Sequence, residues 1–288
     1  MNRLPITKTP KCFVGGAFIR SESGRVYPLQ DSSGEFFANI PLCTRKDLRN
    51  AVEAAAKAFS SWSARSAYNR GQILYRLAEM IEPRADELVC AIMTTQPDRL
   101  AAEHEVQTTI DRIVHYAGWT DKYGPLLGSV NPVASSHFNF TVIEPMGIVG
   151  VIAPEESSLL GLLSMILPAI TSGNAVVALT SHTRPYSSIL LGEMLAVSDL
   201  PAGVVNILTG ARADILPTMA THEHIRAVYA CTDRAARKEV QEGCAESVKR
   251  AVFLDEEKTI DWHSESAQGL DKIRSFVESK TVWHPIGN

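Results

Sequence analysis

The stretch from residue 143 to 181 constrains the fold most, because it reads as strand, loop, helix and strand. Gly147–Ile152 is a short run rich in β-branched residues, and Leu159–Ile170 is an almost wholly apolar helix. Gly173 follows where a left-handed helix cap is needed. Ala175–Leu179 is a continuous apolar run, as expected for a parallel strand covered on both faces. The stretch therefore predicts a βαβ unit, whose first loop is a common binding place for a nucleotide or phosphate.

The chain after this unit continues the same alternation. Apolar runs predict strands at residues 204–208, 225–230 and 251–254, and the segments between them predict helices at 187–197, 213–220 and 234–243. Strands that alternate with helices favour a parallel sheet with helices on both faces. We therefore expect an α/β fold with a Rossmann-like, doubly wound parallel sheet of about five strands.

The amino-terminal third predicts a layer of helices on this sheet. Gly15-Gly16 separates two short extended runs and indicates a hairpin. Apolar residues then recur at helical spacing in three segments, which begin near Thr44, Ile73 and Ile110. We expect these helices to pack on the later sheet.

Two segments predict strands of a different kind. In the stretch 137–143, Phe138, Phe140 and Val142 alternate with polar residues, which is the period-two pattern of a strand with one covered face. The tail 280–284 contains Val282 and Trp283 and also reads as a strand. We expect a hairpin at 132–145 inserted in a domain that spans 1–258, a polar linker at 259–269, and a helix followed by a strand at 270–288.

Composition limits the partners. The chain of 288 residues has a formal net charge of −4 and a pI near 6.1, which argues against nucleic acid or an anionic membrane as the main partner. The most apolar helix is too short to span a bilayer. Five scattered cysteines without CxxC spacing are typical of reduced thiols in the cytoplasm, and we expect that location.

Several segments, in order along nearly the whole chain, resemble the aldehyde dehydrogenase superfamily. They are VGGAFIRSESGRVYPL, KDLRNAVEAAAKAFSSW, IEPMGIVGVIAP, LPAITSGNAVV, DLPAGVVNILTG and VESKTVW. YNRGQILYRLAEMIEPRADEL, PEESSLLG and TVWHPIG are more narrowly similar to the truncated second domain of the two-domain family-16 aldehyde dehydrogenases. The resemblance implies a coenzyme domain of Rossmann type and a β arm that extends the catalytic-domain sheet of a neighbouring subunit.

The coenzyme motifs of that family are altered here. The Asn of a Pro-Trp-Asn motif helps to stabilise the oxyanion, but Pro154 is followed by Glu155 and Glu156, whose charge would oppose an oxyanion or a pyrophosphate. Leu179 and His182 stand where the Lys and Glu of a Lys-Pro-Ser-Glu motif hold the adenosine ribose. Thr232 ends the stretch that replaces the Phe-Thr-Gly-Ser turn under the pyrophosphate. We expect these five positions to be degenerate. We therefore expect the chain to bind no cofactor, or to bind NAD only weakly.

The catalytic motifs are altered too. The Glu-Leu-Gly-Gly-Lys motif with the general base becomes Leu254 to Lys258, and only the Lys is retained. About twenty residues separate Lys258 from Lys280, where the family has a catalytic domain with its nucleophilic Cys; this is too few residues for a domain. We therefore expect the catalytic domain to be absent and the chain to be a pseudoenzyme, with no catalytic residues of its own.

Other candidate sites are weak. Cys231 has the best location of the cysteines for a catalytic thiol, but a small buried thiol is the better interpretation. The pair His222 and His224 lacks further metal ligands, so we expect a solvated turn and no metal site.

We interpret the chain as a non-catalytic subunit that assembles with an active aldehyde dehydrogenase chain, or with itself, through Phe138, Phe140, Val142, Val282 and Trp283. The alternatives are a weak NAD-dependent aldehyde oxidoreductase and a nucleotide-binding module without catalysis.

Overall fold

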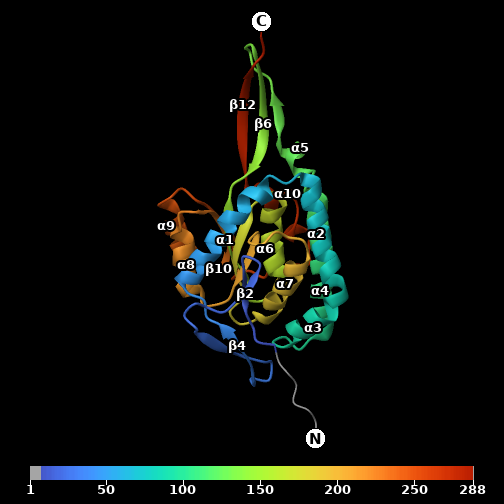
Figure 1. Ribbon diagram of the computed structural model, residues 1–288, viewed down its shortest axis with the longest axis vertical. Coiled ribbons are helices and arrows are strands. Elements are labelled where there is room, and N and C mark those ends of the chain that lie inside the picture. The colour runs from blue at the N-terminus through green and yellow to red at the C-terminus, as the bar shows by residue number, and fades with distance from the viewer. Residues whose placement is uncertain (1–7, 288) are drawn as a thin grey trace.

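The computed structural model describes residues 8–287. Residues 1–7 of the expected 1–258 domain and residue 288 of the expected carboxyl-terminal segment lie outside that range. Figure 1 shows an α/β body from which a narrow β arm projects.

A sheet of seven strands forms the centre of the body, in the order β11-β10-β7-β8-β9-β1-β2. The first five are parallel to one another, and the expected doubly wound α/β fold is confirmed. Their bounds are β7 Ile148–Ile152, β8 Ala175–Leu179, β9 Val205–Leu208, β10 Ile225–Thr232 and β11 Arg250–Asp255. The hairpin of β1 (Cys12–Val14) and β2 (Ala17–Ile19) extends the sheet beyond β9 with antiparallel pairing.

The central strands are apolar without interruption because both faces are buried. Val149 and Val151 of β7 belong to one hydrophobic cluster, whereas Ile148 and Ile152 belong to another cluster on the other face. Successive side chains of a strand point to opposite faces, so each face receives every second residue. A sheet of this kind leaves its strand ends, not its faces, for polar side chains.

Helices cover both faces of the sheet. On one face lie α1 (Arg45–Ser63), α8 (Arg212–Thr221) and α9 (Arg234–Ala245). On the other lie α6 (Leu160–Thr171) and α7 (Tyr186–Val197), and α6 is covered in turn by α4 (Arg99–Trp119). The remaining elements of this second layer are α2 (Ala67–Ile81), η1 (Glu82–Arg84), α3 (Ala85–Met93), α5 (Tyr123–Leu127) and α10 (Leu270–Arg274).

Local sequence explains where the helices start. Thr44 caps α1, and the side chain of Asp47 accepts a hydrogen bond from the Thr44 backbone, so the two form a capping box. Asp98 caps α4, and Asp233 caps α9.

A separate two-stranded sheet of β3 (Val26–Gln30) and β4 (Phe36–Pro41) lies below the body in Figure 1.

The arm is a three-stranded antiparallel sheet in the order β12-β6-β5. Its strands are β5 (Ser129–Asn131), β6 (His137–Pro145) and β12 (Val277–Pro285). β6 and β12 pair along their whole length, from Val277 opposite Pro145 to Pro285 opposite His137. The chain therefore pairs its tail with its own inserted segment, and both outer edges of the arm lack a strand in the part of the chain that is described.

The stretch 259–269, expected as a polar linker, is tied to the body. It contains η2 (Glu265–Ala267), and its Trp262 is buried. A guanidinium nitrogen of Arg112 in α4 donates to the Trp262 carbonyl over 2.7 Å. The expectation rested on polarity alone, which does not reveal contacts made by backbone carbonyls.

No helix between residues 8 and 287 combines the length and apolar character needed to cross a membrane.

Candidate functional site

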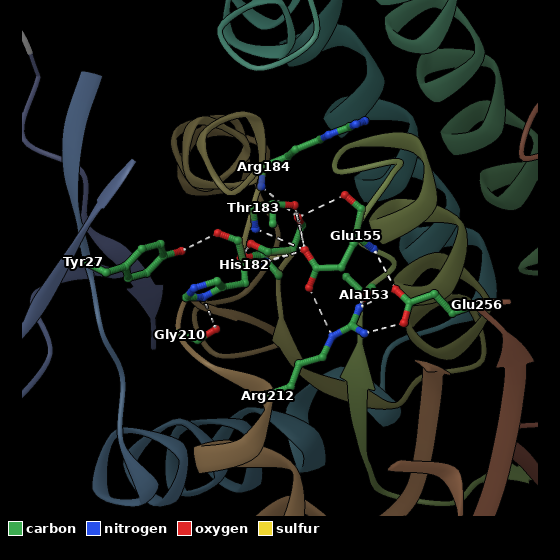
Figure 2. Close-up of polar contacts among 11 residues, drawn as sticks. Tyr27, Ala153, Glu155, His182, Thr183, Arg184, Gly210, Arg212 and Glu256 are labelled. Carbon is green, nitrogen blue, oxygen red and sulfur yellow. Dashed lines mark hydrogen bonds and ion pairs between the residues drawn. The ribbon is translucent and has the colours of Figure 1, made fainter. Parts of the chain in front are cut away.

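The five parallel strands end at one edge of the sheet, and the loops that follow them carry a connected polar network. Glu155 follows β7, His182 and Thr183 follow β8, Arg212 follows β9, and Glu256 follows β11. Figure 2 shows the Glu155 carboxylate between Arg212 and the loop that carries His182 and Thr183, with Glu256 on the other side of the Arg212 guanidinium. This edge is where doubly wound sheets bind their ligands.

The Glu155 carboxylate is held by the loop after β8. Its Oε2 accepts hydrogen bonds from the Ser181 hydroxyl (2.7 Å) and from the backbone N–H groups of His182 (2.9 Å) and Thr183 (3.1 Å). The Thr183 hydroxyl donates to the same oxygen over 3.0 Å. These donors form a small cradle for an anion, and the anion in it belongs to the chain itself.

Arg212 joins Glu155 to Glu256. Its Nε lies 3.3 Å from Glu155 Oε1, and its two terminal nitrogens contact the two Glu256 oxygens at 2.6 and 3.0 Å. The terminal nitrogen at 3.0 Å also donates to the Ala153 carbonyl over 2.7 Å. The two-point contact with Glu256 is the geometry that an arginine adopts with a carboxylate when both are fixed.

The network determines the protonation of its members. Burial by itself would raise the pKa of Glu155, but the Ser181 hydrogen bond, the Arg212 charge and the loop N–H groups outweigh burial and lower this pKa. Burial would lower the pKa of Arg212, but the hydrogen bond to Glu256 and the charges of Glu155 and Glu256 raise it. Both side chains therefore stay charged at neutral pH, although their exposed fractions are only 26% and 19%.

The other expected positions lie around this network but not all in it. The His182 ring stacks on Tyr27 with centroids 4.3 Å apart, and its Nδ1 lies 3.1 Å from the Gly210 carbonyl. Glu156 is exposed, and its carbonyl accepts from Arg184 over 2.7 Å. Leu179 is fully buried in the core beneath, and Thr232 is buried at the end of β10. The structure thus brings together Glu155 and His182, and separates Glu156 and Leu179 from them.

Sequence reasoning missed Arg212 and the role of Glu256. A usable signal was present, because Arg212 begins α8 after the short loop that follows β9, and a loop after a parallel strand leads to the same edge as the other loops. Glu155 and Glu156 are adjacent in the sequence but lie in different surroundings. Glu155 faces the cradle, whereas Glu156 is exposed.

The nearest cavity is acidic. It has a volume of about 490 Å³, and its lining includes Glu105, Glu156, Asp261 and one arginine, Arg184. A phosphate there would meet three carboxylates, and it would reach the cradle N–H groups only by displacing Glu155. This edge of the sheet is arranged to hold an anion, and the chain supplies that anion.

The alternative sites stay weak in the structure. Cys231 is buried, and burial is the main cause that raises its pKa to about 12, so it is not a thiolate at neutral pH. The rings of His222 and His224 lie 5.9 Å apart. No group of three or more His, Cys, Asp or Glu side chains is placed to hold a metal ion within residues 8–287.

The arm carries a second candidate site, and its register divides the expected interface residues. Phe140 lies opposite Val282 and also opposite Val130 of β5. Residues directly opposite in an antiparallel pair share a face, so Phe138, Phe140, Val142 and Val282 share one face of the arm. Trp283 lies opposite Asn139, on the other face. Alternation along a single strand could not show that Trp283 is separated from the other four.

The face with the four apolar residues is open, and it also carries Lys280 opposite Val142 and His284 opposite Phe138. Phe138 is 45% exposed and Val130 is 68% exposed, whereas Asn139 on the other face is buried. The other face is polar, with Asn131 donating to Asn139 over 2.6 Å and Trp283 packing edge-on against His137. The phenyl rings of Phe138 and Phe140 lie 5.4 Å apart and form the centre of the open face.

Comparison with known proteins identifies the relatives of this arrangement. Residues 18–254 match the family model described as "Aldehyde dehydrogenase family". The chain is 33% identical to retinal dehydrogenase 2 from Gallus gallus over 256 residues, which cover 86% of this chain and 48% of that protein. The chain thus spans about half the length of this curated relative.

Solved structures share the fold. The structure is similar to the NAD+ complex of aldehyde dehydrogenase from Bacillus cereus, with a TM-score of 0.80 and 24% identity over 85% of this chain and 50% of that chain. It is also similar to a betaine aldehyde dehydrogenase from Staphylococcus aureus in complex with NAD+, with a TM-score of 0.81 and 21% identity over 86% of this chain and 50% of that chain.

These findings correct one expectation. We expected from the altered motifs that the chain is not an enzyme, and that expectation is wrong, because its relatives are named dehydrogenases. The expectation of no cofactor also lacks support, since the two structural relatives are described with NAD+. The five altered positions belong to the coenzyme motifs of this chain alone. They do not determine the activity of an assembly that contains the chain.

Proposed function

The chain belongs to the aldehyde dehydrogenase family, and from that membership we propose that it takes part in NAD-dependent aldehyde oxidation within an assembly. In this proposal the chain supplies a coenzyme-type domain and an arm. The arm docks on the catalytic domain of an active aldehyde dehydrogenase chain, or it pairs with the arm of a further copy. The narrower resemblance to the second domain of the family-16 enzymes belongs to the same proposal.

The observation that carries the proposal is the open arm. It is a paired sheet of three strands with one apolar face, and two edges without a partner strand in the described chain. An exposed sheet edge is a ready template for another strand. Strand addition obtains affinity from main-chain hydrogen bonds and register from alternate side chains. Phe138, Phe140 and Val282 would supply that register.

We propose that NAD binds more weakly than to a relative with an empty cradle. The N–H groups of His182 and Thr183 are already used by Glu155, and hydrogen bonds to a charged group contribute about 1.5–3 kcal/mol each. A dinucleotide that uses the same donors must displace Glu155 first.

The cytoplasmic location expected from the cysteines stays a prediction.

Two proline variants test the docking. Neighbouring residues of an antiparallel strand point their N–H groups to opposite edges, so one of Thr281→Pro and Val282→Pro removes a donor from the open edge of β12. The other removes a bond to β6. The chain is co-expressed with full-length retinal dehydrogenase 2 as the reference catalytic chain, and separately alone, and molar mass is measured after size exclusion.

We expect the native chain to form a complex either with retinal dehydrogenase 2 or, when expressed alone, with itself. The open-edge variant should lose that complex while its circular dichroism spectrum is unchanged. Aldehyde-dependent NADH formation by the complex should fall together with the mass. Docking through this strand is contradicted if the native chain stays monomeric both alone and in the co-expression. It is also contradicted if neither proline variant weakens the complex.

A further inference from the structure

Two buried thiols lie against each other outside the polar network. The Sγ atoms of Cys12, the first residue of β1, and Cys43, in the loop between β4 and α1, are 3.3 Å apart. Both side chains are fully buried, and they are separated by 31 positions in the sequence. The pair therefore joins two segments that are distant along the chain.

Thr209 holds the pair in place. Its hydroxyl lies 3.4 Å from Cys12 Sγ and donates to the Pro41 carbonyl over 2.6 Å. The Cys43 N–H donates to the Thr209 carbonyl over 3.0 Å. Since Thr209 directly follows β9, the two thiols are fixed to the end of a central strand.

We propose that Cys12 and Cys43 are a redox dithiol, which a peroxide oxidises to an intramolecular disulfide. A disulfide bond is about 2.05 Å long, so the two sulfurs have to approach by only about 1.2 Å from their present separation. Cys231 and Cys244 are also buried, but no hydrogen bond to a second thiol is recorded for either within residues 8–287.

The chemistry requires one thiolate and one nearby thiol. The hydrogen bond from Cys43 lowers the pKa of Cys12 despite its burial, so Cys12 is the first nucleophile. Its thiolate attacks one peroxide oxygen, the O–O bond breaks, and Cys12 becomes a sulfenic acid while the leaving hydroxide takes a proton to form water. The Cys43 sulfur, losing its proton, then attacks Cys12 Sγ; the S–O bond breaks and a second water leaves. The two sulfurs together lose two electrons, and the peroxide gains them.

The oxidant reaches the pair by local opening of β1. This strand has three residues, and its register with β9 consists of the single pair Phe13 and Ile207. Short strands with few pairs to their neighbour open at low free energy compared with the core. Closure on the oxidised pair would then clamp the amino-terminal hairpin to the start of α1.

The test counts alkylated thiols in the full-length chain. It uses a Cys90→Ser background, because Cys90 is the exposed cysteine and would be oxidised directly. The folded protein is treated with hydrogen peroxide, denatured, alkylated with N-ethylmaleimide and weighed by mass spectrometry. The adduct number should fall from four to two, and trypsin should release residues 12–20 cross-linked to residues 26–45.

Matched variants separate this pair from the other thiols. Adding Cys12→Ser should leave three adducts before and after peroxide, and adding Cys43→Ser should give no cross-link, whereas adding Cys244→Ser should take the number from three to one. The oxidised background protein should also melt at a higher temperature than its reduced form, because the cross-link restricts the unfolded chain.

Two results would overturn the proposal. One is four adducts after peroxide with the thiols still reduced, which would show that the buried pair is inert in the folded protein. The other is a cross-link that joins Cys231 or Cys244, or that forms only after the chain is unfolded in urea.

Discussion

Glu155 shows at the scale of one residue how an altered motif acquires a structural role. Its carboxylate satisfies two loop N–H groups and two hydroxyls, and it pairs with Arg212. The charge at Glu155, expected from the sequence to repel a ligand, instead ties the loops after β7, β8 and β9 together. The sequence predicted that this position is unusual. It could have indicated that Arg212 lies at the same edge of the sheet, but not that the two side chains pair, because no local pattern encodes a contact between loops.

The first prediction concerns Glu155→Gln. The variant keeps the side-chain shape but loses the charge, so the free energy of unfolding at pH 7 should fall by about 1.5–3 kcal/mol, the range for a hydrogen bond to a charged group. Urea unfolding measures it. Glu156→Gln is the control, because Glu156 is exposed, and it should change the free energy by less than about 0.5 kcal/mol. Equal effects of the two variants would contradict the role given to Glu155.

The pH dependence follows from the same group. The pKa of Glu155 is lower in the folded chain than its ordinary value of 4.5. Its contribution is therefore complete above the unfolded pKa, and it is lost as the pH falls through the lower folded pKa. The difference in unfolding free energy between the native chain and Glu155→Gln should shrink as the pH is lowered from about 5 toward 3. A difference that grows on acidification would reverse the sign of the assigned shift.

The second prediction concerns ligand access to the cradle. Glu155→Ser removes the carboxylate and leaves the N–H groups of His182 and Thr183 free beside Arg212. NAD measured by calorimetry should bind this variant more tightly than the native chain, by at least tenfold, because no internal anion has to be displaced. Arg184→Gln is a matched change outside the cradle and should not tighten binding. Equal affinities of native chain and Glu155→Ser would contradict the competition.

At the scale of elements, the sequence was most informative where burial is uniform. The parallel strands and the helix at 159–170 were predicted because a strand or helix covered on all sides is almost wholly apolar, and α6 spans Leu160–Thr171. The sequence left the separate helix α3 open, because Pro83 in η1 can either end the helix before it or restart it. The faces of the arm were missed because they depend on the register between β6 and β12.

The third prediction tests how α1 packs on the sheet. Gly203, before β9, has a φ of +91°, and a Cβ there would lie 2.6 Å from the backbone oxygen of Ala54 in α1. Gly203→Ala should therefore cost both backbone strain, about 1–2 kcal/mol, and a shift of the helix, about 1–3 kcal/mol. Gly24→Ala is the matched control. Its φ is +68°, but a Cβ would meet nothing within 4 Å, so only the strain should appear in the unfolding free energy.

At the scale of the whole molecule, the body and the arm are separable. The connection between them is anchored by Phe276, which is fully buried and whose carbonyl accepts from Asn174 over 2.8 Å. Beyond Val277 the strand β12 projects with the arm, as Figure 1 shows, and contributes little buried surface to the body. The body should therefore fold without the outer part of β12, and this makes the assembly surface accessible to experiment.

The last prediction follows from this separation. A chain that ends before Lys280 keeps Ile273 and Phe276 in the body but loses most of β12. Its helical circular dichroism signal should match that of the full chain, while the mass of the complex measured after size exclusion should fall to that of separate chains. A chain that ends before Leu270 is the control: it also removes the buried Ile273 and Phe276, so it should lose stability by several kcal/mol. If the shorter cut at Lys280 unfolds the body as well, β12 belongs to the core. If the complex survives that cut, assembly uses another surface, and the role of the arm in the proposed function is wrong.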